Sequence, residues 1–253
     1  DHHNVQILLS GVMLLLTMQT PTARRGVLAG LAAAAHLAIS LEGLPGVVLF
    51  AAIMAFEWIV TSRAAARDRF VAYMGSLAYC AILLQFVTRG PDGILQRWCD
   101  GLSQPYLAAI AVAGIGCAAI GWFDRRRPFS MPMRVGAIGG VALLAGGAML
   151  AIAPQCARGP FGTLDPLVVQ YWYRNVREGL PVWNRIDALF AFAVAPLAIG
   201  LVGTVGAWWS TRHAELRRLW LILLAAQTGT SVLALLVLRT GSTAHLFALP
   251  GLA

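Results

Sequence analysis

The chain alternates between long apolar runs and short polar segments. A membrane-spanning helix needs about 20 consecutive, mostly apolar residues. The runs predict eight such spans, at residues 5–20, 26–41, 44–61, 70–88, 105–123, 135–154, 187–209 and 219–238. We expect helices, because no segment shows the alternation of about ten residues that marks a membrane β-strand.

Composition supports a membrane protein. The 253 residues are 58% hydrophobic and 12% charged, whereas about 25% of residues are charged in a soluble domain. A soluble globule and a disordered chain are therefore excluded. We expect an all-α, polytopic helix bundle that forms one transmembrane domain over residues 1–253. The chain starts at Asp1 and ends in an apolar run too short to span the membrane, so we expect a piece of a longer protein, truncated at both ends.

The distribution of arginine predicts the orientation. All 19 basic residues are arginines, and twelve of them lie in the loops after the first, third, fifth and seventh spans. Arginine-rich loops face the cytoplasm. The 89–104 and 155–186 loops then lie outside. That face has seven of the eleven acidic residues, namely Asp1, Glu42, Asp92, Asp100, Asp165, Glu178 and Asp187. We expect a multi-pass protein of a bacterial inner membrane, with its active face in the periplasm. The expected partners of its arginines are membrane lipids and not nucleic acid.

The outer 155–186 loop is predicted to be structured. Asp165 and Pro166 are typical of a helix start, and Gly179 and Pro181 of a helix stop. One face between them is apolar and aromatic, with Leu167, Val168, Tyr171, Trp172 and Val176. This pattern predicts an amphipathic helix in the membrane interface. It fits an aromatic anchor and a substrate-facing element equally well.

The four cysteines divide by position. Cys80 and Cys117 lie inside spans and are interpreted as packing residues. Cys99 and Cys156 lie in two different outer loops, where an oxidising compartment permits a disulfide. We treat them as a candidate pair.

The chain opens with Asp1-His2-His3-Asn4-Val5-Gln6, directly before an apolar run. A carboxylate and an imidazole two residues apart can reach one divalent cation. A polar cap on the start of a helix is the simpler alternative, since Asp1 would also interact favourably with the helix dipole. The residues alone leave both interpretations open.

This opening resembles the second acidic motif of archaeal-type oligosaccharyltransferase catalytic subunits, which are GT-C class membrane glycosyltransferases. The similarity covers about the first 55 residues. It continues through Arg24 and Arg25, the segment from Val27 to Leu31, and Ser40-Leu-Glu-Gly-Leu-Pro-Gly46. It implies a GT-C-like fold, a polyprenyl-phosphate sugar donor, and a divalent cation (Mg or Mn) held by Asp1 and His3. The family has Glu where this chain has Gln6, and the family's peptide-binding motif is not in this chain, so transfer of a lipid-linked sugar is expected rather than peptide glycosylation.

Other residues are candidates for the same chemistry. Glu42 lies at an outer helix boundary, either as a loop carboxylate or, with Asp1, as a catalytic acid near the metal. Four outer arginines suit a phosphate or lipid headgroups: Arg174, Arg177, Arg185 and Arg239. Trp172 is grouped with them as a substrate-binding candidate.

Two other classes of function compete with a glycosyltransferase. A secondary transporter places ionisable residues near the middle of the bilayer, and the middles of the eight spans contain no Asp, Glu or Arg. This favours the enzyme, while a non-catalytic lipid-binding subunit stays open. His36 and Gln85 inside spans predict interhelical hydrogen bonds. Close helix packing is predicted for Gly136, Gly139, Gly140, Gly146, Gly147, Gly200, Gly203 and Gly206.

Overall fold

The computed structural model describes residues 2–159, 164–184 and 188–253, and the regular elements of these residues are all helical. The α-helices are α1 (His2–Met18), α2 (Ala23–Ile39), α3 (Leu44–Thr61), α4 (Ala64–Leu95), α5 (Gln104–Arg126), α6 (Met131–Ile152), α7 (Pro166–Tyr171), α8 (Ala188–Ser210), α9 (Ala214–Leu236) and α10 (Gly241–Leu252). Six of them, namely α3 to α6, α8 and α9, are long and apolar enough to cross a membrane. The architecture is that of a multi-pass membrane protein. Helices α1 and α2 have 17 residues each, so the count of eight spans stays a prediction.

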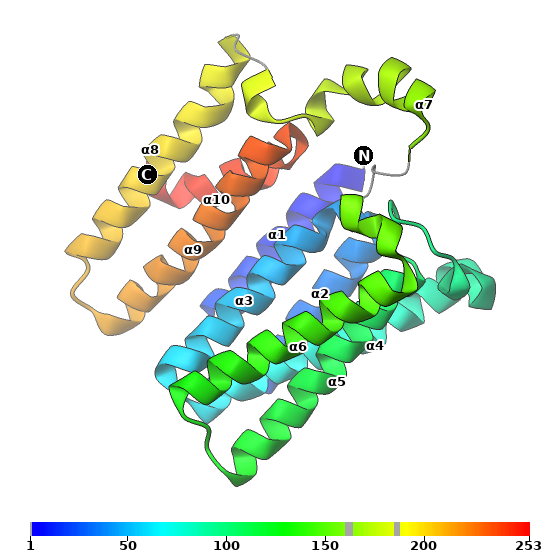
Figure 1. The fold of residues 1–253 in the computed structure, drawn as a ribbon. Helices are drawn as coiled ribbons and strands as arrows, with labels where there is room; N and C mark the ends of the chain where they lie inside the picture. The colour runs from blue at the N-terminus through cyan, green and yellow to red at the C-terminus, as the bar shows by residue number, and fades with distance from the viewer. Residues whose placement is uncertain (1, 160–163, 185–187) are drawn as a thin grey trace. The chain divides into compact units, whose positions relative to one another are not determined.

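The helices form two compact units (Figure 1), unit 1 from Asp1 to Thr163 and unit 2 from Leu164 to Ala253. Unit 1 contains α1 to α6, and unit 2 contains α7 to α10. The boundary falls within the predicted 155–186 loop. Each unit is compact by itself. Whether the two form the single transmembrane domain expected from the sequence is not tested, so that domain stays a prediction.

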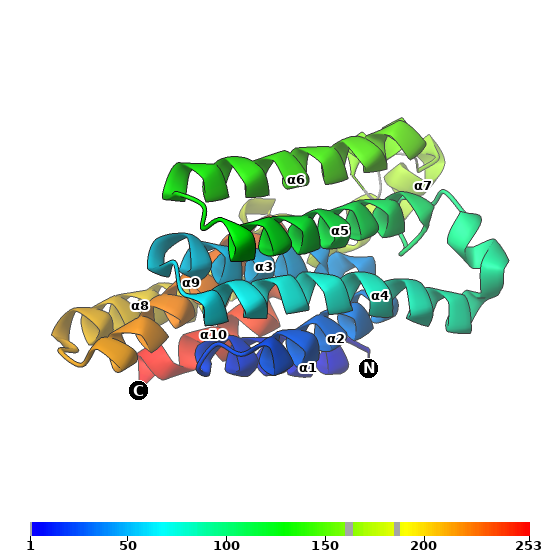
Figure 2. The ribbon, with the colours of Figure 1, turned by 90° about the horizontal axis from the view of Figure 1, so that it is seen from below.

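Unit 1 is built around α4, which packs against α2, α3 and α5, while α6 packs on α5 at the edge (Figure 2). Short connections make consecutive helices antiparallel. The turns at 19–22, 62–63 and 127–130 therefore lie at one end, called here the Arg-rich end. The opposite end, called the disulfide end, carries the start of α1, the 3₁₀ turns η1 (Leu41–Gly43) and η2 (Pro154–Arg158), and residues 96–103.

Glycines decide which helices approach most closely. A Cβ at Gly26 or Gly30 of α2 would overlap a backbone carbonyl oxygen of α4, from Arg69 or Tyr73 respectively. In unit 2, a Cβ at Gly203 of α8 would overlap the carbonyl oxygen of Gly251 in α10. Close packing predicted for Gly200 and Gly203 is thus confirmed.

The same prediction is wrong for α6. In the described part of the chain, a Cβ would meet nothing within 4 Å at Gly136, Gly139, Gly140, Gly146, Gly147 and, on α8, Gly206. The physical reason is the position of α6 at the edge of unit 1, where Arg134 is its buried residue. Small residues permit close packing, but a neighbouring backbone must also be present.

Helix α4 is longer than its predicted span at 70–88 and is kinked near its end. Gly90 has a φ of 69°, which only glycine adopts easily, and the helix then runs on to Leu95. Gln85 donates to the carbonyl of Gly93, 3.3 Å away across the kink. The prediction of an interhelical hydrogen bond for Gln85 is therefore wrong. The one predicted for His36 is confirmed, because its Nε2 lies 3.2 Å from Ser10 Oγ on α1.

Helix α7 of unit 2 begins as predicted but ends early. The backbone N–H of Leu167 donates to Asp165 Oδ1 at 2.8 Å, which caps α7. The α-helix stops at Tyr171, and the chain continues in the 3₁₀ turns η3 (Tyr173–Asn175), η4 (Arg177–Gly179) and η5 (Val182–Asn184). The prediction of a continuous amphipathic helix to Gly179 is thus wrong. The Asn175 side chain donates to the Tyr171 carbonyl at 2.9 Å, and this carbonyl would accept the N–H of residue 175 in a continuing α-helix.

Candidate functional site

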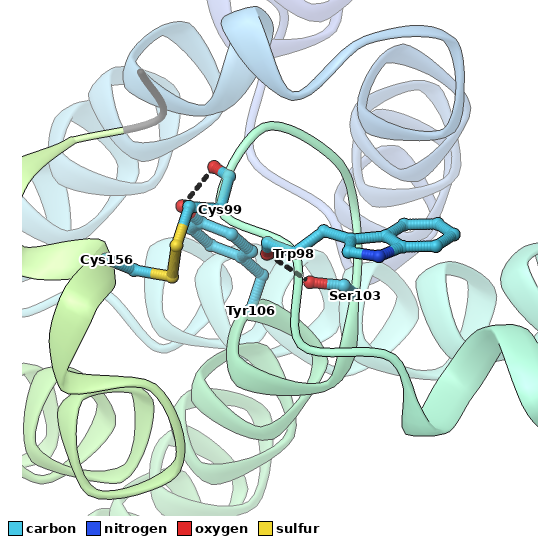
Figure 3. Close-up of a disulfide and its surroundings, with 5 residues drawn as sticks. All are labelled: Trp98, Cys99, Ser103, Tyr106 and Cys156. Atoms are coloured by element: carbon cyan, nitrogen blue, oxygen red, sulfur yellow. Dashed lines mark hydrogen bonds between the residues drawn. A yellow bond between two sulfur atoms is a disulfide. The ribbon is translucent and has the colours of Figure 1, made fainter. Parts of the chain in front are cut away.

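The disulfide end of unit 1 contains the predicted bridge. Cys99 and Cys156 are joined, with Cα atoms 5.2 Å apart and a sequence separation of 57 residues. Tyr106 donates its hydroxyl to the Cys99 carbonyl at 2.7 Å, and Ser103 donates to the Trp98 carbonyl at 2.6 Å (Figure 3). The bridge ties the loop between α4 and α5 to η2. Cys80 and Cys117 are free.

A cluster of polar side chains at this end joins α1, α2 and η1, and we call it the polar corner. It consists of the polar residues Gln6, Ser10, His36 and Ser40, together with Gly43, which lies against His36. Gln6 is buried, and its Nε2 donates to the Ser40 carbonyl at 3.5 Å. Gly43 lies against the His36 ring so closely that a Cβ would overlap Nδ1. These contacts hold η1 against the first two helices.

Two predicted site residues lie close in sequence to residues of the polar corner. His3 lies on α1 one turn before Gln6, and Glu42 follows Ser40 by two residues in η1. The Glu42 backbone N–H donates to Ser40 Oγ at 3.3 Å, which fixes the turn that carries its carboxylate. Both His3 and Glu42 are half-buried.

The predicted metal site is not completed by the described residues. Asp1 lies outside them, and they contain no group of three or more His, Cys, Asp or Glu side chains that could hold a metal ion. Coordination by Asp1 and His3, and catalysis by Asp1 and Glu42, therefore stay predictions. Among the described residues, His3 offers a nitrogen donor on α1 and Glu42 an oxygen donor in η1.

The predicted substrate-binding residues lie in unit 2. Arg239 donates to Glu178 Oε1 at 2.7 Å, and the neighbouring Leu238 N–H donates to the Leu180 carbonyl at 3.2 Å. A phosphate would thus have to compete with Glu178 for Arg239. Trp172 is exposed. Arg185 and the side chains of Arg174 and Arg177 lie outside the described residues.

A buried ion pair at the Arg-rich end was not predicted from the sequence. Arg69 of α4 is fully buried and pairs with Glu57 of α3. It also donates to the carbonyls of Thr17 at 2.6 Å and Gln19 at 3.2 Å, at the end of α1. Terminal carbonyls of a helix lack partners within the helix. Arg69 therefore donates hydrogen bonds to the end of α1, while Glu57 of α3 balances its charge.

A second ion-pair cluster lies nearby around Asp124 of α5. Asp124 pairs with Arg67 at 3.1 Å and with Arg134 at 3.6 Å, and it accepts the Phe129 N–H at 2.8 Å. Arg134 also donates to Ser62 at the end of α3. In the sequence these arginines had only indicated sidedness. The available signal was Glu57, an acid inside a predicted span.

The chain was compared with known proteins. No protein-family model, no curated protein and no solved structure matches it. What the chain does is therefore inferred from its own residues and their geometry.

Proposed function

We propose that this chain is a GT-C-like membrane glycosyltransferase, which moves a sugar from a polyprenyl-phosphate-linked donor to an acceptor at the disulfide end of unit 1. The observation that carries the proposal is the polar corner. It joins the start of α1 to η1 through the Gln6–Ser40 contact, with His3 one turn from Gln6 along α1 and Glu42 two residues from Ser40. The opening Asp-His-His motif begins two residues before His3.

Two independent signals support an extracytoplasmic site. Disulfides persist in oxidising compartments, and Cys99–Cys156 lies at the same end of unit 1 as His3 and Glu42. Arginine-rich turns favour the cytoplasm, and they lie at the opposite end. Both signals support a proposed site on the periplasmic face of a bacterial inner membrane.

The proposal gives each candidate residue a role. Asp1 and His3 would hold Mg²⁺ or Mn²⁺, which supplies positive charge to the lipid phosphate that leaves the sugar. Glu42 would act as the second carboxylate of the site. The outer arginines of unit 2, with Trp172, would contact the donor through the bidentate geometry that suits phosphate.

The positions of buried charges favour an enzyme over a secondary transporter. The buried Asp, Glu, Arg and His side chains of unit 1, in its described part, lie within two turns of helix ends. The polar contact in the middle of α8 and α9 is neutral, with Thr204 Oγ1 2.8 Å from Gln227 Oε1. A transporter would be expected to place charges or broken helices at that depth.

The experiment is a donor-consumption assay. Membranes that contain the protein are incubated with polyprenyl-phosphate-linked radiolabelled sugars, with Mn²⁺ or with EDTA, and the label lost from the lipid fraction is counted. We expect Mn²⁺-dependent loss, reduced at least about 100-fold by Glu42→Gln, as for a group that acts in acid–base chemistry. Glu215→Gln, an exposed carboxylate in unit 2, is the matched control and should leave the rate unchanged. Equal rates for the two variants, or no label lost from any donor, would contradict the proposal.

A further inference from the structure

A tryptophan and an arginine are stacked at the Arg-rich end of unit 1. The guanidinium carbon of Arg126 lies 3.7 Å from the centroid of the Trp122 ring. The two residues are one turn apart at the end of α5, so helical spacing brings them together. Trp122 is 47% exposed and Phe123 is 53% exposed, with their ring centroids 5.1 Å apart. The apolar helix thus ends in an exposed aromatic pair with a cation on it.

The positive charge at this end is not balanced by carboxylates. Asp68 and Asp124 are the acids beside it, and both are occupied by other arginines, namely Arg67, Arg125 and Arg134. Among the residues that the structure describes, Arg126 and Arg127 have no carboxylate partner, and both are exposed. An anion is therefore the expected occupant of this surface.

Unit 2 contains the same arrangement. At the turn between α8 and α9, the guanidinium carbon of Arg217 lies 4.7 Å from the centroid of the Trp208 ring. Arg217 is exposed, and so is Trp209, which follows Trp208 in the sequence. Glu215 is the acid in this turn, and three arginines accompany it, namely Arg212, Arg217 and Arg218. Each unit thus pairs a stacked arginine with an excess of positive charge at an Arg-rich turn.

We propose that these two arginine–tryptophan stacks bind the phosphate of an anionic phospholipid headgroup. Tryptophan at the end of a membrane span lies at headgroup depth. Stacking on the indole covers one face of the guanidinium, while its N–H edge stays available for two phosphate oxygens. A net negative headgroup is favoured over a zwitterionic one, because Arg126 and Arg127 have no carboxylate partner among the described residues, and three arginines accompany one acid at the turn between α8 and α9. The stack in unit 1 lies at the end opposite the proposed sugar-transfer site. Lipid binding at the stacks does not depend on that site.

The test measures lipid binding to the purified chain in detergent micelles. Phosphatidylglycerol or phosphatidylcholine is titrated in, and bound lipid is counted by native mass spectrometry. We expect tighter binding of phosphatidylglycerol, and an affinity about fivefold lower for Arg126→Gln, the loss expected for one arginine near an anionic surface. Arg126→Lys keeps the charge without the planar group and should fall between Arg126→Gln and the wild type.

The matched control is Arg97→Gln, which removes the same charge from an exposed arginine at the disulfide end, where Arg97 is hydrogen-bonded to Gln104. It should leave the affinity unchanged. Equal losses for Arg97→Gln and Arg126→Gln would overturn the proposal, since net charge alone would then explain binding. Displacement of phosphatidylglycerol by millimolar inorganic phosphate would also overturn it, because the site would then take free phosphate rather than lipid.

Discussion

Arg69 of α4 donates to Glu57 of α3 inside unit 1, where the Arg69 side chain is 0% exposed and the Glu57 side chain is 8% exposed. Taking two charges out of water is costly, and their attraction offsets the cost only while both are present. The pair links two helices that run in opposite directions, and Arg69 also reaches the end of a third. The Arg-rich end therefore contains ion pairs that belong to the core. Its arginines do more than indicate the orientation of the chain in the membrane.

The first prediction concerns this pair. Glu57→Leu leaves the Arg69 charge buried without its carboxylate and should lower the free energy of unfolding by about 3–5 kcal/mol. Chemical denaturation in detergent micelles measures the loss. The double variant Glu57→Leu/Arg69→Met, which removes both charges, should recover more than half of it. A single variant as stable as Glu215→Leu, an exposed control, would show that the pair is unimportant.

The second prediction concerns glycine packing. Gly30→Ala places a Cβ on the Tyr73 carbonyl of α4 and should cost about 1–3 kcal/mol, the usual penalty of overpacking. Gly139→Ala on α6 meets open space, so it should be neutral or slightly stabilising. Thermal denaturation of the two variants in the same detergent provides the comparison. If both variants lost the same stability, close contact between α2 and α4 would not be the cause.

Much of the fold follows from the sequence, because an apolar run in a membrane protein must satisfy its backbone as a helix. The Asp165 cap also follows from local chemistry. An interhelical bond for His36 follows from the position of this residue inside a span, but its partner, Ser10, does not. The kink at Gly90 and the early end of α7 do not, since they depend on side-chain bonds made by Gln85 and Asn175.

Site residues were harder to predict for a related reason. The sequence marks His3 and Glu42 as polar residues at apolar boundaries, but only packing places them at one corner. It also treats each arginine as a loop charge. Pairing of Arg69 with Glu57 requires that α3 and α4 be adjacent and in register, which composition does not encode.

The third prediction concerns sidedness. In a Cys80→Ala/Cys117→Ala background, the Cys99–Cys156 disulfide leaves no free thiol, so an introduced cysteine reports its own position. A membrane-impermeant maleimide added outside intact cells should label Asp92→Cys at the disulfide end. It should label Ser130→Cys at the Arg-rich end only after the membrane is permeabilised. The opposite pattern would place His3 and Glu42 in the cytoplasm and contradict the proposed site.

The most direct measurement of the proposed function is the metal requirement of sugar transfer in three neighbouring variants. Asp1→Asn removes a ligand charge but almost no volume, so it should abolish Mn²⁺-dependent donor consumption while the helical circular dichroism stays unchanged. His3→Ala should raise the Mn²⁺ concentration for half-maximal rate by about tenfold or more, through loss of one ligand. His2→Ala, the adjacent control, should have a much smaller effect. Wild-type rates and an unchanged Mn²⁺ requirement in both Asp1→Asn and His3→Ala would contradict the account and leave Asp1 as a helix cap.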